Sequence, residues 1–286
     1  MSSHHHHHHG ESQKNIATAF FMNFCFMLFE IIVGMISGSI AIVSDSFHDL
    51  GDSLSLGVSW ILESKKDKSA NDDYNYGYKK LSVVGAIINI FVLIIAIFVS
   101  LYQAVKRFFN PEPIKTGIVI VVAIIGAIVN AIPIIKMKAS KTISEKTVSL
   151  HLLEDVLTWC ALLIVSVIVH LTRWYFLDSC FAIIICVVLS VGVIKNCISI
   201  FRIIMDAKPK QINLDEVSDA IKSTNDNIES VKELKVRDID GESFVADIKI
   251  QLKKDFEVNN IEDIYNQINN ELEKFEIHST TIQIYF

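Results

Sequence analysis

Apolar residues dominate residues 11–206, in six long runs separated by short polar turns. A helix needs about 20 mostly apolar residues to cross the hydrocarbon core of a bilayer, and each run reaches roughly that length. Ser37-Gly38-Ser39 is a tight turn, and Asn110-Pro111 ends a helix. The pattern predicts six transmembrane helices: Asn15–Ile36, Ile40–Leu62, Leu81–Phe108, Gly117–Ile135, Val148–His170 and Tyr175–Met205.

The pattern changes after residue 206, where polar and apolar positions alternate over short segments. A helix start at Asn213 is followed by an alternating strand, an Asp240-Gly241 hairpin turn and a return strand. Residues 259–275 have a helical period, and residues 280–286 form a last strand. We therefore expect an α-β-β-α-β tail domain over residues 207–286, with two layers of α+β type.

Composition supports this division into two parts. The chain has 286 residues, of which 51% are hydrophobic and 20% charged, with a net charge of −6. A soluble domain carries about 25% charged residues, so a single soluble globule is excluded. No basic patch stands apart from the membrane flanks, which excludes a nucleic-acid binder. Residues 1–10, MSSHHHHHHG, are interpreted as an expression tag, leaving a membrane domain over 11–206.

The distribution of lysines predicts the orientation of the chain. Placing the N-terminus inside puts most of them in the inner loops, namely Lys65, Lys66, Lys68, Lys79, Lys80, Lys136, Lys138, Lys141 and Lys146. Cytoplasmic loops are the ones enriched in Lys and Arg. Both termini and the tail domain are therefore expected in the cytoplasm.

Ionisable residues cluster on two of the predicted helices. His48 and Asp52 on the second helix are four residues apart, and so are His151 and Asp155 on the fifth. A charge at mid-membrane costs at least ~2.5–3.5 kcal/mol, so such residues are functional candidates. Side chains at i and i+4 share a helix face. Facing pairs would supply two imidazoles and two carboxylates, the tetrahedral set that Zn²⁺ prefers, and the carboxylates would neutralise its charge.

Further acidic residues surround this predicted site. Asp45 shares the face of His48 and Asp52, and we expect it to support the site or line its vestibule. Glu30 and Asp178 are expected to face a wet cavity. Asp49 and Glu154 point away from the ligand faces, and their roles stay open. Three asparagines within the spans, Asn23, Asn89 and Asn130, are expected to hold helices together.

Three stretches carry a family resemblance. Gly38–Asp52, with the sequence GSIAIVSDSFHDLGD, resembles the second-helix signature of the cation diffusion facilitator family. Tyr76–Leu81 and the HxxxD pair His151/Asp155 resemble the same family, and HxxxD on both helices resembles its zinc-transporting subgroup. The resemblance implies a homodimer in the bacterial inner membrane, a ferredoxin-like tail and exchange of divalent metal for protons.

We therefore expect a secondary transporter that exports Zn²⁺, and also Cd²⁺, by alternating access, without an organic cofactor. Four ligands leave no open coordination position, which argues against an enzyme. Two alternatives stay open, a Mn²⁺ or Fe²⁺ transporter of the same family and a membrane metal sensor with little flux. Relatives place accessory metals in the loop before the third helix and in the tail. The loop offers Asp72 and Asp73 as ligands, and His278 is the single histidine of the tail, so no closed accessory site is expected.

Overall fold

The computed structural model describes residues 7–63, 79–137, 143–241, 243–253 and 261–285. Within these ranges the side chains of residues 7–16, 133–137, 143–152 and 278 fall outside the description. The chain divides into two compact units, Met1–Ser64 with Ile88–Lys195, and Lys65–Ile87 with Asn196–Phe286. The domain boundary between residues 206 and 207 stays a prediction.

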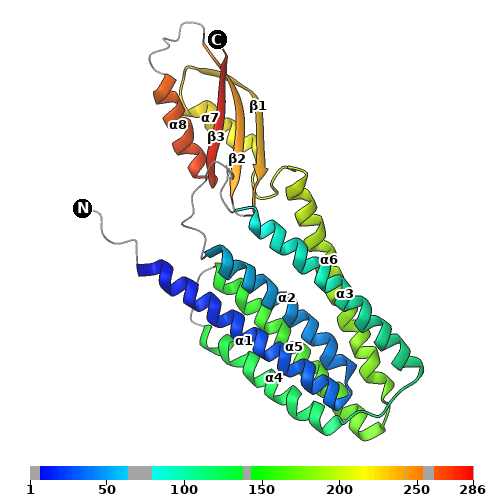
Figure 1. Cartoon of the computed structure of the whole chain (residues 1–286). Coiled ribbons are helices and arrows are strands. Elements are labelled where there is room, and N and C mark those ends of the chain that lie inside the picture. The colour runs from blue at the N-terminus through cyan, green and yellow to red at the C-terminus, as the bar shows by residue number, and fades with distance from the viewer. Residues whose placement is uncertain (1–6, 64–78, 138–142, 242, 254–260, 286) are drawn as a thin grey trace. The chain divides into compact units, whose positions relative to one another are not determined.

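Each of the six apolar runs forms a helix (Figure 1). The helices are α1 (His7–Ser37), α2 (Ile40–Glu63), α3 (Leu81–Phe109), α4 (Thr116–Met137), α5 (Ile143–Thr172) and α6 (Phe176–Ile204). α1 begins earlier than predicted and includes tag residues, whereas its apolar span is Ala17–Ser37. Gly38 adopts the left-handed conformation, with φ +75°, that ends α1 before α2 starts.

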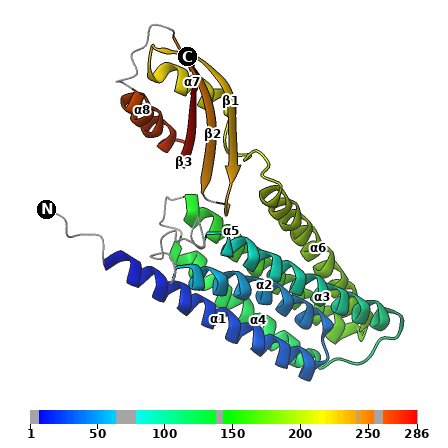
Figure 2. The ribbon, with the colours of Figure 1, turned by 45° about the horizontal axis from the view of Figure 1, so that its top comes forward.

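Within the first unit, α1 packs along α2, α4 packs along α5, and α1 also contacts α4 (Figures 1 and 2). Glycines permit two close approaches. A Cβ atom at Gly34 would lie 2.6 Å from Val43 Cγ2, and one at Gly126 would lie 2.4 Å from Trp159 Cδ2. A hydrophobic cluster that includes Ala41, Trp159 and Leu162 forms part of the interior of the bundle.

Four stretches of the described chain are long and apolar enough to cross a membrane: Ala17–Ser37, Leu81–Phe109, Leu153–Thr172 and Phe176–Ile204. A shorter apolar helix covers Thr116–Ile132. The acidic residues of α2 lower its hydropathy, so it is not among these stretches. Large apolar side chains on the outside of the helices, such as Phe91 and Phe98 at 64% and 70% exposure, suit a lipid environment. Six crossings stay a prediction.

The tail confirms the predicted order α-β-β-α-β. Its elements are α7 (Leu214–Thr224), β1 (Ile228–Asp238), β2 (Phe244–Leu252), α8 (Ile261–Glu273) and β3 (Ile277–Tyr285). The sheet has the order β1-β2-β3 and is mixed, because β2 pairs antiparallel with β1 and parallel with β3. Parallel neighbours need a crossover connection, and α8 lies in it. The ferredoxin-like likeness stays a prediction.

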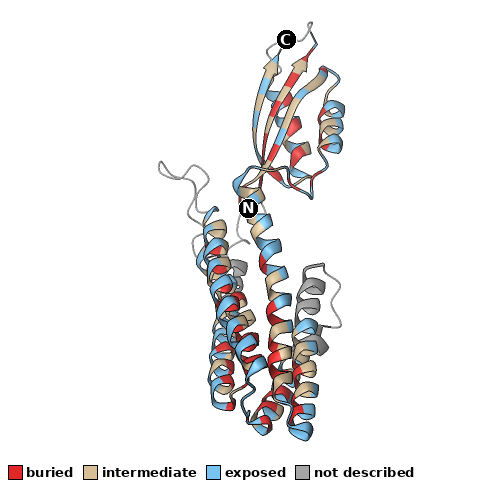
Figure 3. Ribbon diagram, turned by 90° about the vertical axis from the view of Figure 1, so that its right-hand side faces the viewer, coloured by how far each residue is buried: buried red, intermediate tan, exposed pale blue. Residues whose placement is uncertain are grey.

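The core of the tail lies between the sheet and its helices. Alternate residues of β2 are buried (Figure 3), including Ile248 and Ile250. They join Ile221 from α7 and Ile268 from α8 in one apolar cluster. Every member of this cluster comes from residues 212–284, so the tail has a core of its own.

Candidate metal site in the membrane helices

The structure brings α2 and α5 together at His48. Its Nε2 atom lies 3.8 Å from Asp52 Oδ2 on the same helix and 3.7 Å from Asp155 Oδ1 on α5. The Asp52 spacing follows from the helical i,i+4 relation, which places both side chains on one face. The Asp155 contact joins residues more than a hundred positions apart, so only the packing of the bundle produces it.

The spacing is slightly wider than that of a metal-bound set. Zinc bonds of about 2.0–2.2 Å in a tetrahedron place ligand atoms about 3.4 Å apart. Both distances from His48 Nε2, 3.8 Å and 3.7 Å, exceed that separation. Accordingly, no group of three or more His, Cys, Asp and Glu side chains in the described part of the chain is already spaced to hold a metal.

The fourth predicted ligand and the accessory positions lie outside the described residues. The backbone of His151 belongs to α5, one turn before Asp155, but its side chain is not among those described. The same applies to the side chain of His278 on β3, and Asp72 and Asp73 fall in a range outside the description. The four-residue set of His48, Asp52, His151 and Asp155 therefore stays a prediction.

Acidic side chains from α1 and α2 gather beside His48. Glu30 is fully buried, and the charges of Asp49, Asp45 and Asp155 all act on its carboxylate. Asp45 is 8% exposed and interacts with both His48 and Asp155. Such a cluster favours a cation, because a positive charge relieves the mutual repulsion of the carboxylates. The supporting role of Asp45 stays a prediction, and Glu30, which was expected to face a wet cavity, is fully buried.

Two asparagines fix α2 near the ligand positions. The side-chain amide of Asn23 on α1 donates to the Asp49 carbonyl at 3.3 Å. The amide of Asn89 on α3 donates to the Gly51 carbonyl at 3.2 Å and to Ser55 Oγ at 3.0 Å. Both asparagines connect helices, as expected. Asn130 donates instead to Gly126 O, at 3.0 Å within its own helix.

Asp178 makes a set of contacts that its sequence position did not indicate. It is 3% exposed, and its carboxylate accepts hydrogen bonds from Ser39 Oγ at 2.5 Å and from Ile40 N at 2.8 Å. A weaker bond of 3.4 Å comes from Ala41 N. An acid on α6 therefore caps the first turn of α2, where free N–H groups and the helix dipole favour negative charge.

Arg107 completes this arrangement, which we call the α2 clamp: Gly38, Ser39, Arg107 and Asp178. The Arg107 guanidinium donates to the Gly38 carbonyl and pairs with Glu112 at 2.9 Å. Sequence reasoning missed Ser39 and Arg107. A Ser followed by an apolar run was the available signal for a helix cap, whereas nothing in the sequence pointed to Arg107.

Glu154, whose role the sequence left open, is exposed on α5. It adjoins Asp155, which is 18% exposed and faces His48. Neighbouring positions on a helix point about 100° apart, so the two acids occupy different environments. Glu154 thus offers a natural comparison for the role of Asp155.

Apolar helices of membrane-spanning length, with a histidine and carboxylates inside their bundle, define an integral membrane protein with a candidate cation site. The family models agree: "Cation efflux transmembrane domain" matches residues 16–205, and "Cation efflux protein, cytoplasmic domain" matches residues 209–285. The chain belongs to the cation efflux family. This result confirms the resemblance to cation diffusion facilitators seen in the sequence.

Curated relatives are similar over most of the chain. It is 27% identical to the cadmium, cobalt and zinc/H(+)-K(+) antiporter of Bacillus subtilis, over 96% of this chain and 89% of that protein. It is 24% identical to the metal cation efflux system protein CzcD of Cupriavidus metallidurans, over 99% and 89% respectively. The zinc transporter ZitB of Pectobacterium atrosepticum is 28% identical, over 65% of this chain and 59% of that protein.

Proposed function

We propose that this protein exports divalent metal cations, Zn²⁺ foremost and Cd²⁺ as well, in exchange for protons. The observation that carries the proposal is the approach of His48 on α2 to Asp155 on α5. It places an imidazole nitrogen and a carboxylate oxygen, two atoms that can bind a metal, next to each other on different helices. Membership of the cation efflux family and relatives named as zinc and cadmium transporters support it.

The proposed transport site consists of His48, Asp52, His151 and Asp155. Two carboxylates neutralise a divalent ion, so the loaded site carries no net charge and can reside within the membrane. Imidazole binds metal only when it is neutral, so protons and metal compete for the same groups. An inward proton gradient would then release the metal on the outer side. Alternating movement of α2 against α5 would expose the site to each side in turn.

We further propose that all six helices cross the bacterial inner membrane, with both termini and the tail in the cytoplasm. The excess of lysines in the loops assigned to the inside supports this orientation. The match of residues 209–285 to the cytoplasmic domain of the family supports a homodimer that includes the tail. No chemical step is assigned to the protein, since the proposed ligands fill the coordination sphere.

The decisive experiment is metal flux into proteoliposomes under an imposed pH gradient, with the histidine tag removed because it binds metal itself. Asp155→Asn keeps the size of the side chain and removes one ligand charge. We expect its Zn²⁺ flux to fall to the level of protein-free vesicles. The matched control is Glu154→Gln, an exposed neighbour on the same helix, whose flux should stay near that of the parent protein.

Two outcomes would change the proposal. Normal zinc flux in Asp155→Asn would remove Asp155 from the transport site. Zinc binding without flux in the parent protein would favour a membrane metal sensor. A competition assay with equal Zn²⁺ and Mn²⁺ decides the remaining alternative, because a manganese transporter would carry Mn²⁺ preferentially.

A further inference from the structure

The chain leaves α6 through a rigid turn. Ala207 N donates to Arg202 O at 2.8 Å and Asp206 N donates to Ile203 O at 3.1 Å. Asp206 takes the left-handed conformation, with φ +49°. These are the two bonds and the backbone angle of a Schellman motif, which fixes the exit direction of the chain. Arg202 Nη2 then donates to Lys208 O at 2.7 Å and holds the following segment against the helix end.

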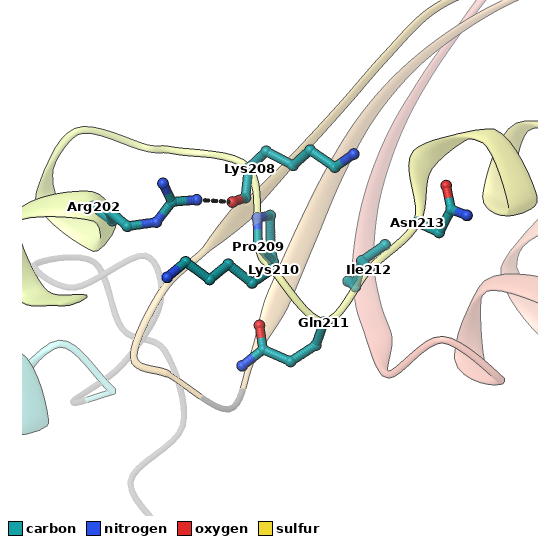
Figure 4. Close-up of a pocket in the computed structure, with 7 residues that line it drawn as sticks. All are labelled: Arg202, Lys208, Pro209, Lys210, Gln211, Ile212 and Asn213. Atoms are coloured by element: carbon teal, nitrogen blue, oxygen red, sulfur yellow. Dashed lines mark hydrogen bonds between the residues drawn. The ribbon is translucent and has the colours of Figure 1, made fainter. Parts of the chain in front are cut away.

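A cavity of about 430 Å³ lies at this turn, lined by Arg202 and residues 208–213 (Figure 4). Pro209 and Ile212 are buried, and Ile212 belongs to the core of the tail. The walls are therefore anchored on both sides, by α6 and by the tail domain. This volume falls in the range of sites that bind small molecules.

Positive charge dominates the rim of the cavity. Arg202, Lys208 and Lys210 surround it, and neither lysine forms an ion pair with any residue in the described ranges. Arg202 and Lys210 extend to the same side of the connecting segment, whereas Lys208 extends to the other (Figure 4). Asn213 is already engaged as the cap of α7. Arg202 and Lys210 are thus the groups available to an anion. Their positive charge contrasts with the acidic composition of the tail that follows.

Apolar side chains continue up to the same helix end. Phe201, Ile204 and Met205 are 63%, 56% and 62% exposed. α6 has 29 residues, a length of about 43 Å, which exceeds the ~30 Å hydrocarbon core. A span of this length reaches the lipid headgroups if it crosses the membrane as proposed. Exposed apolar groups beside unpaired cations match the two parts of a phospholipid, its acyl chains and its phosphate.

We infer that the cavity after α6 binds the phosphate headgroup of an anionic phospholipid, with Arg202 and Lys210 as the phosphate contacts. Placing this lipid in the inner leaflet rests on the proposed function, in which the tail is cytoplasmic. The contacts between the phosphate and the cations do not depend on that orientation. Arginine suits a phosphate because its planar guanidinium presents paired donors. A soluble phosphate could make the same contacts with Arg202 and Lys210. The exposed apolar side chains at the end of α6 favour a lipid instead.

The test is a lipid titration of the full-length, tag-free protein, followed by native mass spectrometry. Phosphatidylglycerol, which is anionic, is compared with phosphatidylcholine, a zwitterion with the same phosphodiester. The soluble probes are glycerol 1-phosphate and inorganic phosphate. We expect preferential retention of phosphatidylglycerol and no binding of either soluble probe at matched concentration. Removing a juxtamembrane cation weakens anionic lipid binding about fivefold.

Three variants make the result specific. Lys210→Gln should weaken phosphatidylglycerol binding about fivefold, and Arg202→Gln should weaken it at least as much. Lys222→Gln removes the same charge from a tail lysine that does not line the cavity and that pairs with Asp219, so it should retain most of the binding. Because Arg202 also holds the turn, Lys210→Gln gives the cleaner comparison.

Equal loss in Lys222→Gln and Lys210→Gln would reduce the site to diffuse surface charge and overturn the inference. Tight binding of a soluble phosphate would assign the cavity to a small anion instead of a lipid. Zinc flux, measured in parallel, separates this proposal from the proposed function. If the parent protein transports zinc but shows no preference for phosphatidylglycerol, only the lipid site is overturned. If it prefers phosphatidylglycerol but transports no zinc, only the proposed transport function is overturned.

Discussion

The Oγ atom of Ser39 on α2 donates a 2.5 Å hydrogen bond to the carboxylate of Asp178 on α6, across 139 residues of sequence. The other carboxylate oxygen accepts from Ile40 N, so one buried acid satisfies the start of the helix that carries His48 and Asp52. Capping bonds of this kind hold a helix end in place. The N-terminal end of α2 is therefore fixed to α6, and the proposed ligands lie two to three turns further along.

Replacing Asp178 by alanine should destabilise the protein. The change leaves the buried N–H of Ile40 without its acceptor, and a buried hydrogen bond to a charged group is worth about 1.5–3 kcal/mol. We expect a lower unfolding temperature in detergent, with the conservative Asp178→Asn losing less, since one oxygen can still accept. Equal unfolding temperatures for Asp178→Ala and the parent protein would contradict the importance of the clamp.

Gly126→Ala tests how α5 is positioned. The new Cβ atom would lie 2.4 Å from Trp159 Cδ2, so Trp159, one turn from Asp155, has to shift. Overpacking of this kind costs about 1–3 kcal/mol. We expect lower stability together with weaker zinc binding by calorimetry. Gly117→Ala on the same helix is the matched control, because no atom lies within 4 Å of its added Cβ. Similar behaviour of the two variants would show that this packing does not position the site.

His48→Asp should change metal selectivity. Oxygen ligands suit harder ions such as Mn²⁺, whereas imidazole suits Zn²⁺. We expect manganese flux to rise relative to zinc in a competition assay at equal concentrations. A third carboxylate also leaves surplus negative charge beside a divalent ion, so flux should shift to higher pH, where that carboxylate ionises. An unchanged ratio with sustained flux would place selectivity elsewhere.

Glu233→Gln should alter the pH dependence of tail stability. Lys235 and Lys249 each lie 2.5 Å from the Glu233 carboxylate, and together they lower its pKa to about 2 from an ordinary 4.5. A lowered pKa in the folded state adds stability above pH 4.5, and this contribution disappears as the pH falls toward 2. The effect is small because the groups are exposed.

Denaturant unfolding of residues 207–286 at low salt measures this dependence, since the tail has its own core. The Gln variant should be less stable than the parent at pH 7 and equally stable near pH 2. Glu229→Gln, on the same strand and exposed, should show neither difference. A constant gap between Glu233→Gln and the parent across the pH range would point to packing instead of charge.

The periodicity of apolar residues and the spacing of polar ones determined much of the secondary structure of this protein. Runs of apolar residues predicted all six helices, because a chain in lipid satisfies its backbone only by forming continuous hydrogen-bonded helices. Alternation at period two predicted β1 and β2, and the Asp240-Gly241 turn joined them. The i,i+4 spacing placed His48 beside Asp52, since that relation is local to one helix. Local geometry of this kind needs no knowledge of the remaining fold.

Tertiary structure decided which of these faces meet. The approach of His48 to Asp155 depends on how α2 and α5 pack in the bundle, which periodicity does not specify. The same is true of Asp178, whose charge in a helix suggested a wet cavity but whose carboxylate caps α2. A buried acid is stable wherever enough donors converge, and donors from distant segments converge only after folding. The sequence thus determined the helices and the chemistry on each, whereas packing determined which residues that chemistry touches.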